Sequence, residues 1–288
     1  MRHGARVERL RLRVGGDRRL AQPTDWALFL ERHRYFLAKS GLLDALLDST
    51  AGGRPKFLTT QWELLVAASS VGAAEARAAM EEVYRLYCYP VYAFIRRRGH
   101  ARYDAQDLTQ DFFVHLLEKG ILAQADSQRG RFRNFLLGSL EHFLAHAAER
   151  AGAGKRGGGC QWVYLDDDAA EDRYQLLAPD GMTAEKLFEA RWAAALVEAA
   201  LVRLRCEMES EGKGNLFEAL KGFLMGRDDS SYQRVANALN LSLGALKTAI
   251  HRLRGRYRAL LREEVARTVA TPAEVDEELR YLRAALSG

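Results

Sequence analysis

Four side chains near the end of the sequence, Lys247, Thr248, His251 and Arg252, have the types and the spacing to bind nucleic acid. If this stretch is helical, they share one face with Gly244, because successive residues of a helix are about 100° apart. A helix that presents small, hydrogen-bonding and cationic side chains on one face suits the major groove of DNA. The pattern therefore predicts a DNA-contacting helix, with a structural or protein-binding helix pair as the plainer alternative.

Two apolar stripes predict the helices that would position this face. Apolar residues recur at i, i+3, i+4 and i+7 in the first helix, and at similar spacing in the second. Asn240 and Leu241 are predicted to break the chain, and Ser242 is a suitable N-cap for the second helix. The stripes are Tyr232, Val235, Ala236 and Leu239, then Leu246, Ile250, Leu253 and Tyr257. Residues 231–258 thus have the pattern of a helix-turn-helix.

A second helix, predicted over 104–119, has an acidic face. Its inward stripe is Ala105, Leu108, Phe112 and Leu116, and its acidic side is Asp104, Asp107, Asp111 and Glu118. These acids align within about 60° on a helical wheel. A solvated surface is the plainer interpretation, and a docking face for a basic protein surface is the alternative.

A basic and aromatic helix is predicted to follow Arg131. Arg131 and Arg133 lie at its start and Arg150 near its end, while Phe132, Leu136, Phe143 and Ala147 form an inward stripe. Cations that meet phosphates and aromatic faces that receive unstacked bases are what single-stranded DNA binding requires. The alternative is that the phenylalanines, including Phe135, belong to the core.

The bulk composition is that of a mildly basic protein with a packed core. The 288 residues are 48% hydrophobic and carry a formal net charge of +5, which favours an anionic partner. The three cysteines, Cys88, Cys160 and Cys206, are far apart and predict a reducing, cytoplasmic location. No apolar run approaches the roughly 20 residues that a membrane helix needs, so no membrane association is expected.

We expect an all-α fold of two helical domains joined by a flexible linker. Prolines are few, and alternating runs of β-branched residues are nearly absent. The predicted division is an N-terminal extension, partly disordered, over 1–55; a first domain over 56–151; a Gly-rich and acidic linker over 152–183; a second domain over 184–269; and a tail over 270–288.

No catalytic or metal site is expected. His142 and His146 are four residues apart, but no third ligand completes a site, and the HExxH order is absent. The Gly-rich stretch 152–156 lacks the spacing of a phosphate-binding loop. No arrangement of Ser or Cys with His resembles an activated nucleophile. We therefore expect no enzyme activity and no cofactor.

The order of these blocks resembles the bacterial RNA polymerase sigma-70 family, in particular its extracytoplasmic-function-like group. The resemblance rests on an acidic DAQDLTQDFF helix, then RGRFRNFLL, then a linker, then the helix-turn-helix SYQRVANALNLSLGALKTAIHRLRGRYRALL, and covers roughly 56–269. It departs from the family at 139–142, which read Ser-Leu-Glu-His where an Asn-Arg pair usually stands.

The resemblance implies roles for named residues. Core RNA polymerase would be bound by Asp104, Asp107, Gln110 and Asp111. The −10 promoter element would be contacted by Arg131, Arg133, Asn134, Phe135, His142 and Arg150. The −35 element would be contacted by Gly244, Lys247, Thr248, His251 and Arg252, with Arg254 and Arg256 on phosphates.

The function expected from this resemblance is that of a sigma factor, which recruits core RNA polymerase to promoter DNA and is in turn controlled, in some members, by an anti-sigma factor. Two alternatives stay open. One is a stand-alone helix-turn-helix regulator that binds an operator. The other is an adaptor that holds polymerase without reading a promoter, which the departure at 139–142 keeps open.

Overall fold

The computed structural model describes residues 73–119, 121–124, 130–152, 170–171, 174–175, 181–225 and 230–287. Within these ranges the chain is helical and contains no strand, which confirms the expected all-α class. The predicted N-terminal extension, Cys160 and most of the predicted linker lie outside the described residues.

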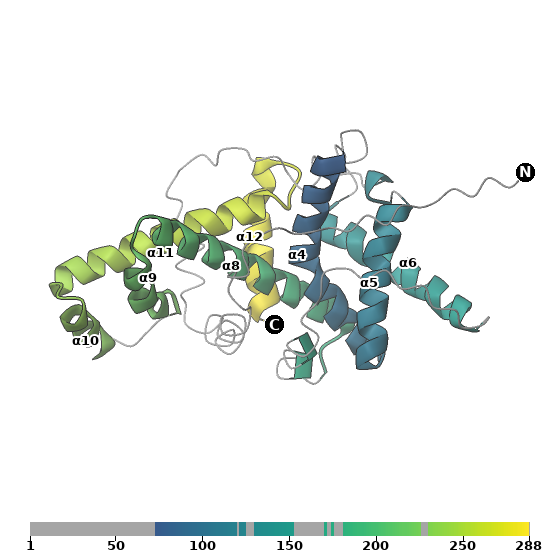
Figure 1. Ribbon diagram of the computed structural model, residues 1–288, viewed down its shortest axis with the longest axis horizontal. Coiled ribbons are helices and arrows are strands. Elements are labelled where there is room, and N and C mark those ends of the chain that lie inside the picture. Colours follow the sequence, from purple (N-terminus) through teal and green to yellow (C-terminus); the bar gives the residue numbers. More distant parts are fainter. Residues whose placement is uncertain are drawn as a thin grey trace, which may run out of the picture.

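The described helices run in the order shown in Figure 1. The α-helices are α4 (Ala73–Arg97), α5 (Arg102–Glu118), α6 (Phe132–Gly152), α8 (Ala184–Ser210), α9 (Gly214–Leu220), α10 (Ser230–Ala238), α11 (Leu243–Ala266) and α12 (Val275–Ser287). Short 3-10 helices are η1 (Ile121–Gln124), η3 (Lys221–Met225) and η4 (Pro272–Glu274). The predicted helices of the acidic face, the aromatic segment and the C-terminal tail are thus all present.

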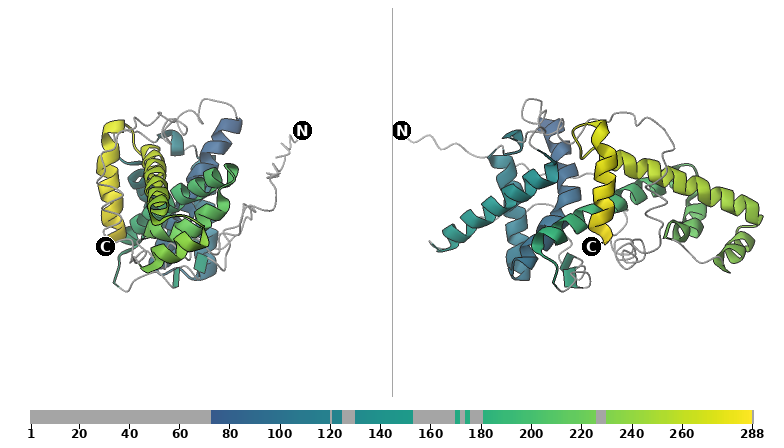
Figure 2. Two further views of the ribbon diagram at one scale, coloured as in Figure 1. Left: turned by 90° about the vertical axis from the view of Figure 1, so that its left-hand side faces the viewer. Right: turned by 180° about the vertical axis from the view of Figure 1, so that it is seen from behind.

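The long helix α8 is the centre of the fold. Thr183 caps its N-terminus, because the Thr183 side chain accepts a hydrogen bond from the backbone N–H of Lys186 at 3.3 Å. Buried residues occur around much of its circumference, including Phe188, Trp192 and Leu196. A helix that is apolar on several sides must be covered on several sides. Accordingly, α4, α11 and α12 all pack against α8 (Figures 1 and 2).

One cluster of buried apolar side chains extends from Met80 in α4 to Leu286 in α12. It includes the predicted inward residues Phe112, Phe132 and Phe143, each nearly or fully buried. Burial confirms the core alternative for Phe132 and Phe143. The helices that the sequence divides between two domains therefore share a core in the described part of the chain.

The packing is elongated, and its two ends are different. The tip formed by α10 and the start of α11 lies at one end, and α5 and α6 lie at the other (Figure 1). Among the described residues, no helix combines the length and the apolar character that crossing a membrane requires.

Candidate nucleic-acid interface

The turn between α10 and α11 is formed as the sequence predicts. Asn240 has a left-handed φ of 52°, and the N–H of Leu241 donates to the carbonyl of Ala236 at 2.9 Å. The N–H of Asn240 donates to the carbonyl of Asn237 at 3.2 Å, which completes the hydrogen-bond pattern of a Schellman motif. These bonds satisfy the last carbonyls of α10 and turn the chain sharply into α11.

The start of α11 is capped by Ser242. The Ser242 backbone is extended, and its hydroxyl accepts a hydrogen bond from the N–H of Ala245 at 3.1 Å. This confirms the predicted N-cap. Thr248, one turn further on, donates its hydroxyl to the carbonyl of Gly244 at 2.9 Å, which fixes the rotamer of a predicted contact residue.

The inward stripe of α11 is buried as predicted. Leu246, Ile250, Leu253 and Tyr257 are at most 5% exposed. The hydroxyl of Tyr257 donates to the carbonyl of Val197 in α8 at 3.1 Å. Burial raises the pKa of Tyr257 well above its ordinary value, so the phenol stays a neutral donor. This contact orients α11 about its axis and thereby determines which face it presents outward.

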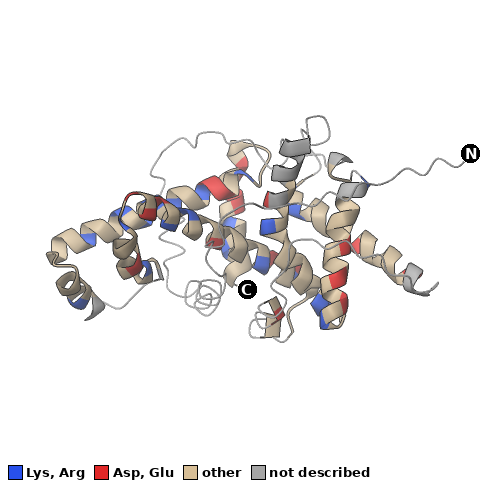
Figure 3. Ribbon diagram, viewed as in Figure 1, with Lys and Arg blue, Asp and Glu red and all other residues tan. Residues whose placement is uncertain are grey.

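The outward face of α11 carries the predicted set. Gly244, Lys247, Thr248, His251 and Arg252 are all exposed. From Ser230 to Arg262 the sequence contains no Asp or Glu. Within the described ranges, Lys247 and Arg252 have neither an ion pair nor a side-chain hydrogen bond, and the same is true of Arg234 on α10. Between Ser230 and Arg262, the tip thus carries exposed cations and no acid (Figure 3).

The cations further along α11 differ from those at the tip, because they have partners within the protein. Arg254 donates from Nε and NH2 to the carbonyl of Phe223, at 3.1 and 2.7 Å. Arg256 forms a bidentate pair with Glu207 of α8, at 2.7 and 2.6 Å. The hydrogen bonds from Arg256 lower the pKa of Glu207. Both residues were predicted to contact phosphates, and here they hold α11 against its neighbours.

The predicted −10 residues are not gathered on one open surface. Asn134 and His142 are exposed, and Phe135 is half-buried. The Nε2 atoms of His142 and His146 lie 3.2 Å apart. No group of three potential metal ligands occurs among the described residues. The backbone of Arg150 lies within α6, but its side chain is outside the described part.

Arg131 and Arg133, which begin the aromatic helix, are bound by the C-terminal helix. Arg131 pairs with Glu274, with Glu277 at 3.0 Å and with Glu278 at 3.3 Å. Arg133 is 6% exposed and pairs with Glu278. In this arrangement, carboxylates of η4 and α12 occupy the positions where a phosphate would bind these arginines.

Three of the four acids predicted for the acidic face of α5 are exposed, and the side chain of the fourth, Glu118, lies outside the described part of the chain. Asp104, Asp107 and Asp111 are exposed, and Gln110 is half-buried. Of the predicted inward stripe, Ala105, Phe112 and Leu116 are fully buried and Leu108 is half-buried. The acids therefore project from a helix whose other face is anchored in the core.

Sequence reasoning did not single out Arg234, Glu264 or Glu278. Arg234 is exposed on α10, the first helix of the helix-turn-helix. Glu264 and Glu278 are 1% exposed, and each lies on the apolar stripe of its helix. A carboxylate at a position that the apolar pattern assigns to the core was the signal that a cation must be buried with it.

No protein-family model, no curated protein and no solved structure matches this chain.

Proposed function

We propose that this chain is a sigma-like initiation factor that recruits core RNA polymerase to promoter DNA. The observation that carries the proposal is the α10–α11 tip, where a capped helix presents Lys247, Thr248, His251 and Arg252 to solvent. The order of motifs that resembles the sigma-70 family supports it. Such a role places the protein in the cytoplasm, where the polymerase acts.

The tip has the chemistry that duplex DNA requires. Arg234 on α10 is placed to bind a phosphate, since the first helix of a helix-turn-helix crosses the DNA backbone. Lys247 and Arg252 can donate to base edges or phosphates from the exposed face of α11. No acid lies between Ser230 and Arg262, so no carboxylate of this segment repels an approaching polyanion.

The acidic face of α5 is the proposed polymerase contact. Asp104, Asp107 and Asp111 form a row of exposed carboxylates on a helix that is rigidly anchored by Phe112 and Leu116. A row of this kind is complementary to a basic helical surface, and charge complementarity gives both rate and register to an association. The −35 contact and the polymerase contact would then lie in opposite halves of the molecule.

One observation favours the second candidate function, a stand-alone helix-turn-helix regulator. The two arginines proposed for −10 recognition, Arg131 and Arg133, are paired with Glu274, Glu277 and Glu278. A protein that binds only through α10 and α11 does not need them. An adaptor that binds polymerase without reading a promoter is the third outcome of the test below.

The test is run-off transcription from a promoter library with purified core polymerase and the full chain. Discrete start sites that share an upstream motif are expected. Two variants separate the contacts: K247A/R252A is expected to abolish motif-dependent starts while polymerase binding persists, and D104N/D107N/D111N is expected to abolish polymerase binding. Glu209→Gln, an exposed acid on α8, is the matched control.

Each failure has its own meaning. Polymerase binding without transcripts from any template would replace the proposal with the adaptor. Sequence-specific DNA binding without polymerase binding would replace it with the regulator. Retention of all starts by K247A/R252A would remove α11 from promoter recognition.

A further inference from the structure

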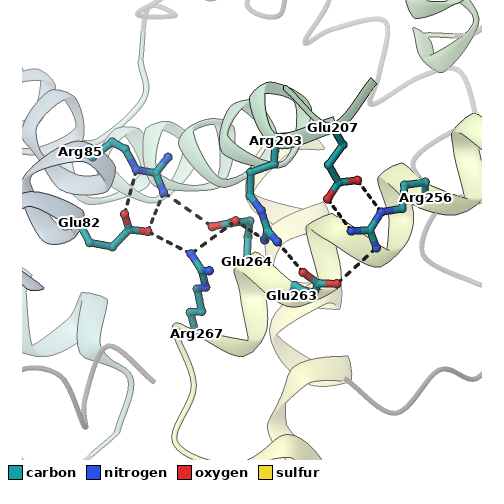
Figure 4. A network of polar contacts seen from close by, with 8 residues as sticks. All are labelled: Glu82, Arg85, Arg203, Glu207, Arg256, Glu263, Glu264 and Arg267. Carbon is teal, nitrogen blue, oxygen red and sulfur yellow. Dashed lines mark hydrogen bonds and ion pairs between the residues drawn. The ribbon is translucent and has the colours of Figure 1, made fainter. Parts of the chain in front are cut away.

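Two buried carboxylates hold the helices of the two predicted domains together. The first is Glu264 of α11, whose Oε1 lies 2.7 Å from Arg203 of α8. Its Oε2 lies 3.7 Å from Arg85 of α4, and Arg267 lies 3.7 Å from Oε1 (Figure 4). One carboxylate thus joins helices from both sides of the predicted linker.

The contacts around Glu264 continue outward as a network. Glu82 of α4 accepts from Arg85 at 2.7 Å and lies 3.6 Å from Arg267. Arg203 also reaches Glu263 at 2.7 Å. Arg256 connects Glu263, at 3.5 Å, to Glu207 of α8. Figure 4 shows these residues as a continuous chain of alternating charge along the junction of α4, α8 and α11.

The second buried carboxylate, Glu278 of α12, joins a different set of helices. It pairs with Arg133 and Arg131 at the start of α6. The guanidinium of Arg133 also lies over the rings of Tyr281, at 4.0 Å, and Trp192 of α8, at 4.8 Å. Glu278 therefore connects α6 to α8 and α12. This connection meets α8 at Trp192, nearer its N-terminus, whereas the first network meets α8 at Arg203 and Glu207.

Buried charges define a geometry more strictly than apolar contacts do. An apolar surface can slide over another at little cost, whereas a buried carboxylate that loses its guanidinium is left uncompensated in a region of low polarity. Glu264 and Glu278 are each 1% exposed, so water does not replace the lost partner. These pairs therefore favour one placement of α4 and α6 relative to α8 and α11.

This placement determines the distance between the two functional ends. Helix α8 has 27 residues, which corresponds to about 40 Å at about 1.5 Å per residue. The α10–α11 tip extends from one end of the packed helices, and α5 and α6 extend from the other (Figures 1 and 2). The two ends are thus separated by packed helices and not by a flexible segment.

We infer that Glu264 and Glu278 are positioning residues that set the separation between the DNA-contacting tip and the α5–α6 half, and so limit the promoter spacer lengths that the protein accepts. The inference on spacer length rests on the proposed function. The inference on separation does not, because it concerns the free chain alone.

The separation is tested first, in the full chain, by pulsed electron spin resonance. Nitroxide labels are attached through A145C on α6 and A259C on α11, both exposed positions, with Cys160 and Cys206 replaced by Ser. Cys88 is buried and is left in place. One narrow distance distribution is expected. A broad distribution in the otherwise unaltered chain overturns the inference without reference to any further variant.

The roles of the two carboxylates are tested by E264Q/E278Q in the same labelled chain. The distribution is expected to become at least twofold wider while the helical circular dichroism signal is retained. If the double variant loses helicity, the single variants are compared in its place. An unchanged distribution in a folded variant overturns the positioning role. Glu211→Gln, which removes an exposed pair with Lys213, is the control and is expected to change nothing.

The spacer limit is tested on one promoter in which the distance between the two elements is varied by single base pairs. The transcription activity of the wild-type chain is expected to show a sharp optimum in spacer length. For E264Q/E278Q, the loss of activity per base pair away from the optimum is expected to be at most one third of the wild-type loss. Equal spacer dependence in the two proteins overturns the spacer inference. Absence of transcripts at every spacing counts against the proposed function, whereas the distance measurement still decides the separation.

Discussion

Arg254 donates two hydrogen bonds to the backbone carbonyl of Phe223, whereas Arg252, two residues earlier on the same helix, is exposed and has no such contact in the described part of the chain. The two arginines carry the same charge but differ in what remains available to a ligand. A matched pair of variants therefore separates binding from packing.

The first prediction compares Arg252→Gln with Arg254→Gln. We expect R252Q to weaken binding to duplex DNA of any sequence and to reduce the slope of log affinity against log salt by about 1, because one phosphate contact is lost. R254Q is expected to leave that slope unchanged and to lower the urea midpoint. Fluorescence anisotropy at four salt concentrations measures both slopes. Equal slopes for the two variants would contradict the assignment.

The second prediction concerns Lys247, which is exposed on the outward face of α11. We expect K247A to change sequence preference at one or two positions, since contacts to base edges carry specificity and contacts to phosphates do not. The measurement is selection of bound sequences from a random duplex pool by wild type and variant. A uniform loss over all sequences would show that Lys247 contacts only the backbone.

The third prediction tests the N-cap of α11. Replacing Ser242 by Ala removes the acceptor for the N–H of Ala245 and is expected to destabilise the protein by about 1 kcal/mol. Replacing Ser242 by Gly is expected to cost only a few tenths of that amount, because Gly is tolerated at N-caps. Urea unfolding followed by circular dichroism measures both. Ser242 is exposed, so no loss of packing confuses the comparison.

The fourth prediction tests the buried pair of α6 and α12. Replacing Arg133 by Met leaves Glu278 buried without its nearest cation, and we expect a loss of about 3–5 kcal/mol in the free energy of unfolding. Burial already raises the pKa of Glu278, although Arg133 and Arg131 oppose this. Adding E278Q to R133M is expected to recover part of the loss. No recovery in the double variant would show that Arg133 acts through Trp192 and Tyr281 instead.

The fifth prediction concerns acid stability and Glu171. Hydrogen bonds from Arg96, at 2.8 and 2.6 Å, lower the pKa of Glu171 to about 2. A carboxyl group with a lowered folded-state pKa stabilises the protein above its unfolded value of 4.5, and this contribution is lost as the pH falls from 4.5 toward 2. E171Q is therefore expected to be less stable than wild type at pH 7 and nearly equal to it at pH 2.5. Urea midpoints at pH 7, 4.5 and 2.5 measure the difference, and a constant difference would refute the assignment.

Local features of the fold were predictable from the sequence, whereas its long-range contacts were not. The stripe from Leu246 to Tyr257 and the cap at Ser242 depend on neighbouring residues, and both are as expected. An apolar stripe tells which face of a helix is buried, but not which helix covers it. The pairing of Arg133 with Glu278, 145 residues later, had no local signal that named the partner.

The same limit explains the outcome for the candidate site. The exposed set on α11 was predictable because its members lie on one helix, and its outward direction follows from the inward stripe. The pairing of Arg131 with Glu274 and Glu277 depends on the C-terminal segment packing beside the start of α6. A basic cluster in a sequence shows that charge is present, and only the structure shows whether another part of the chain has already neutralised it.

The separation of charge along the molecule has a consequence for the first encounter with DNA. The segment from Ser230 to Arg262, which includes the tip, has no acid, whereas α5, in the opposite half, exposes Asp104, Asp107 and Asp111 (Figure 3). Among the described residues, the exposed cations of the tip and the exposed acids of α5 therefore lie at opposite ends of the long axis. A polyanion attracts the cations of the tip and repels the acids of α5, which favours an approach with α11 forward before any side chain makes contact. The orienting field extends over about 10 Å at 0.1 M salt, so productive collisions become rarer as ionic strength rises.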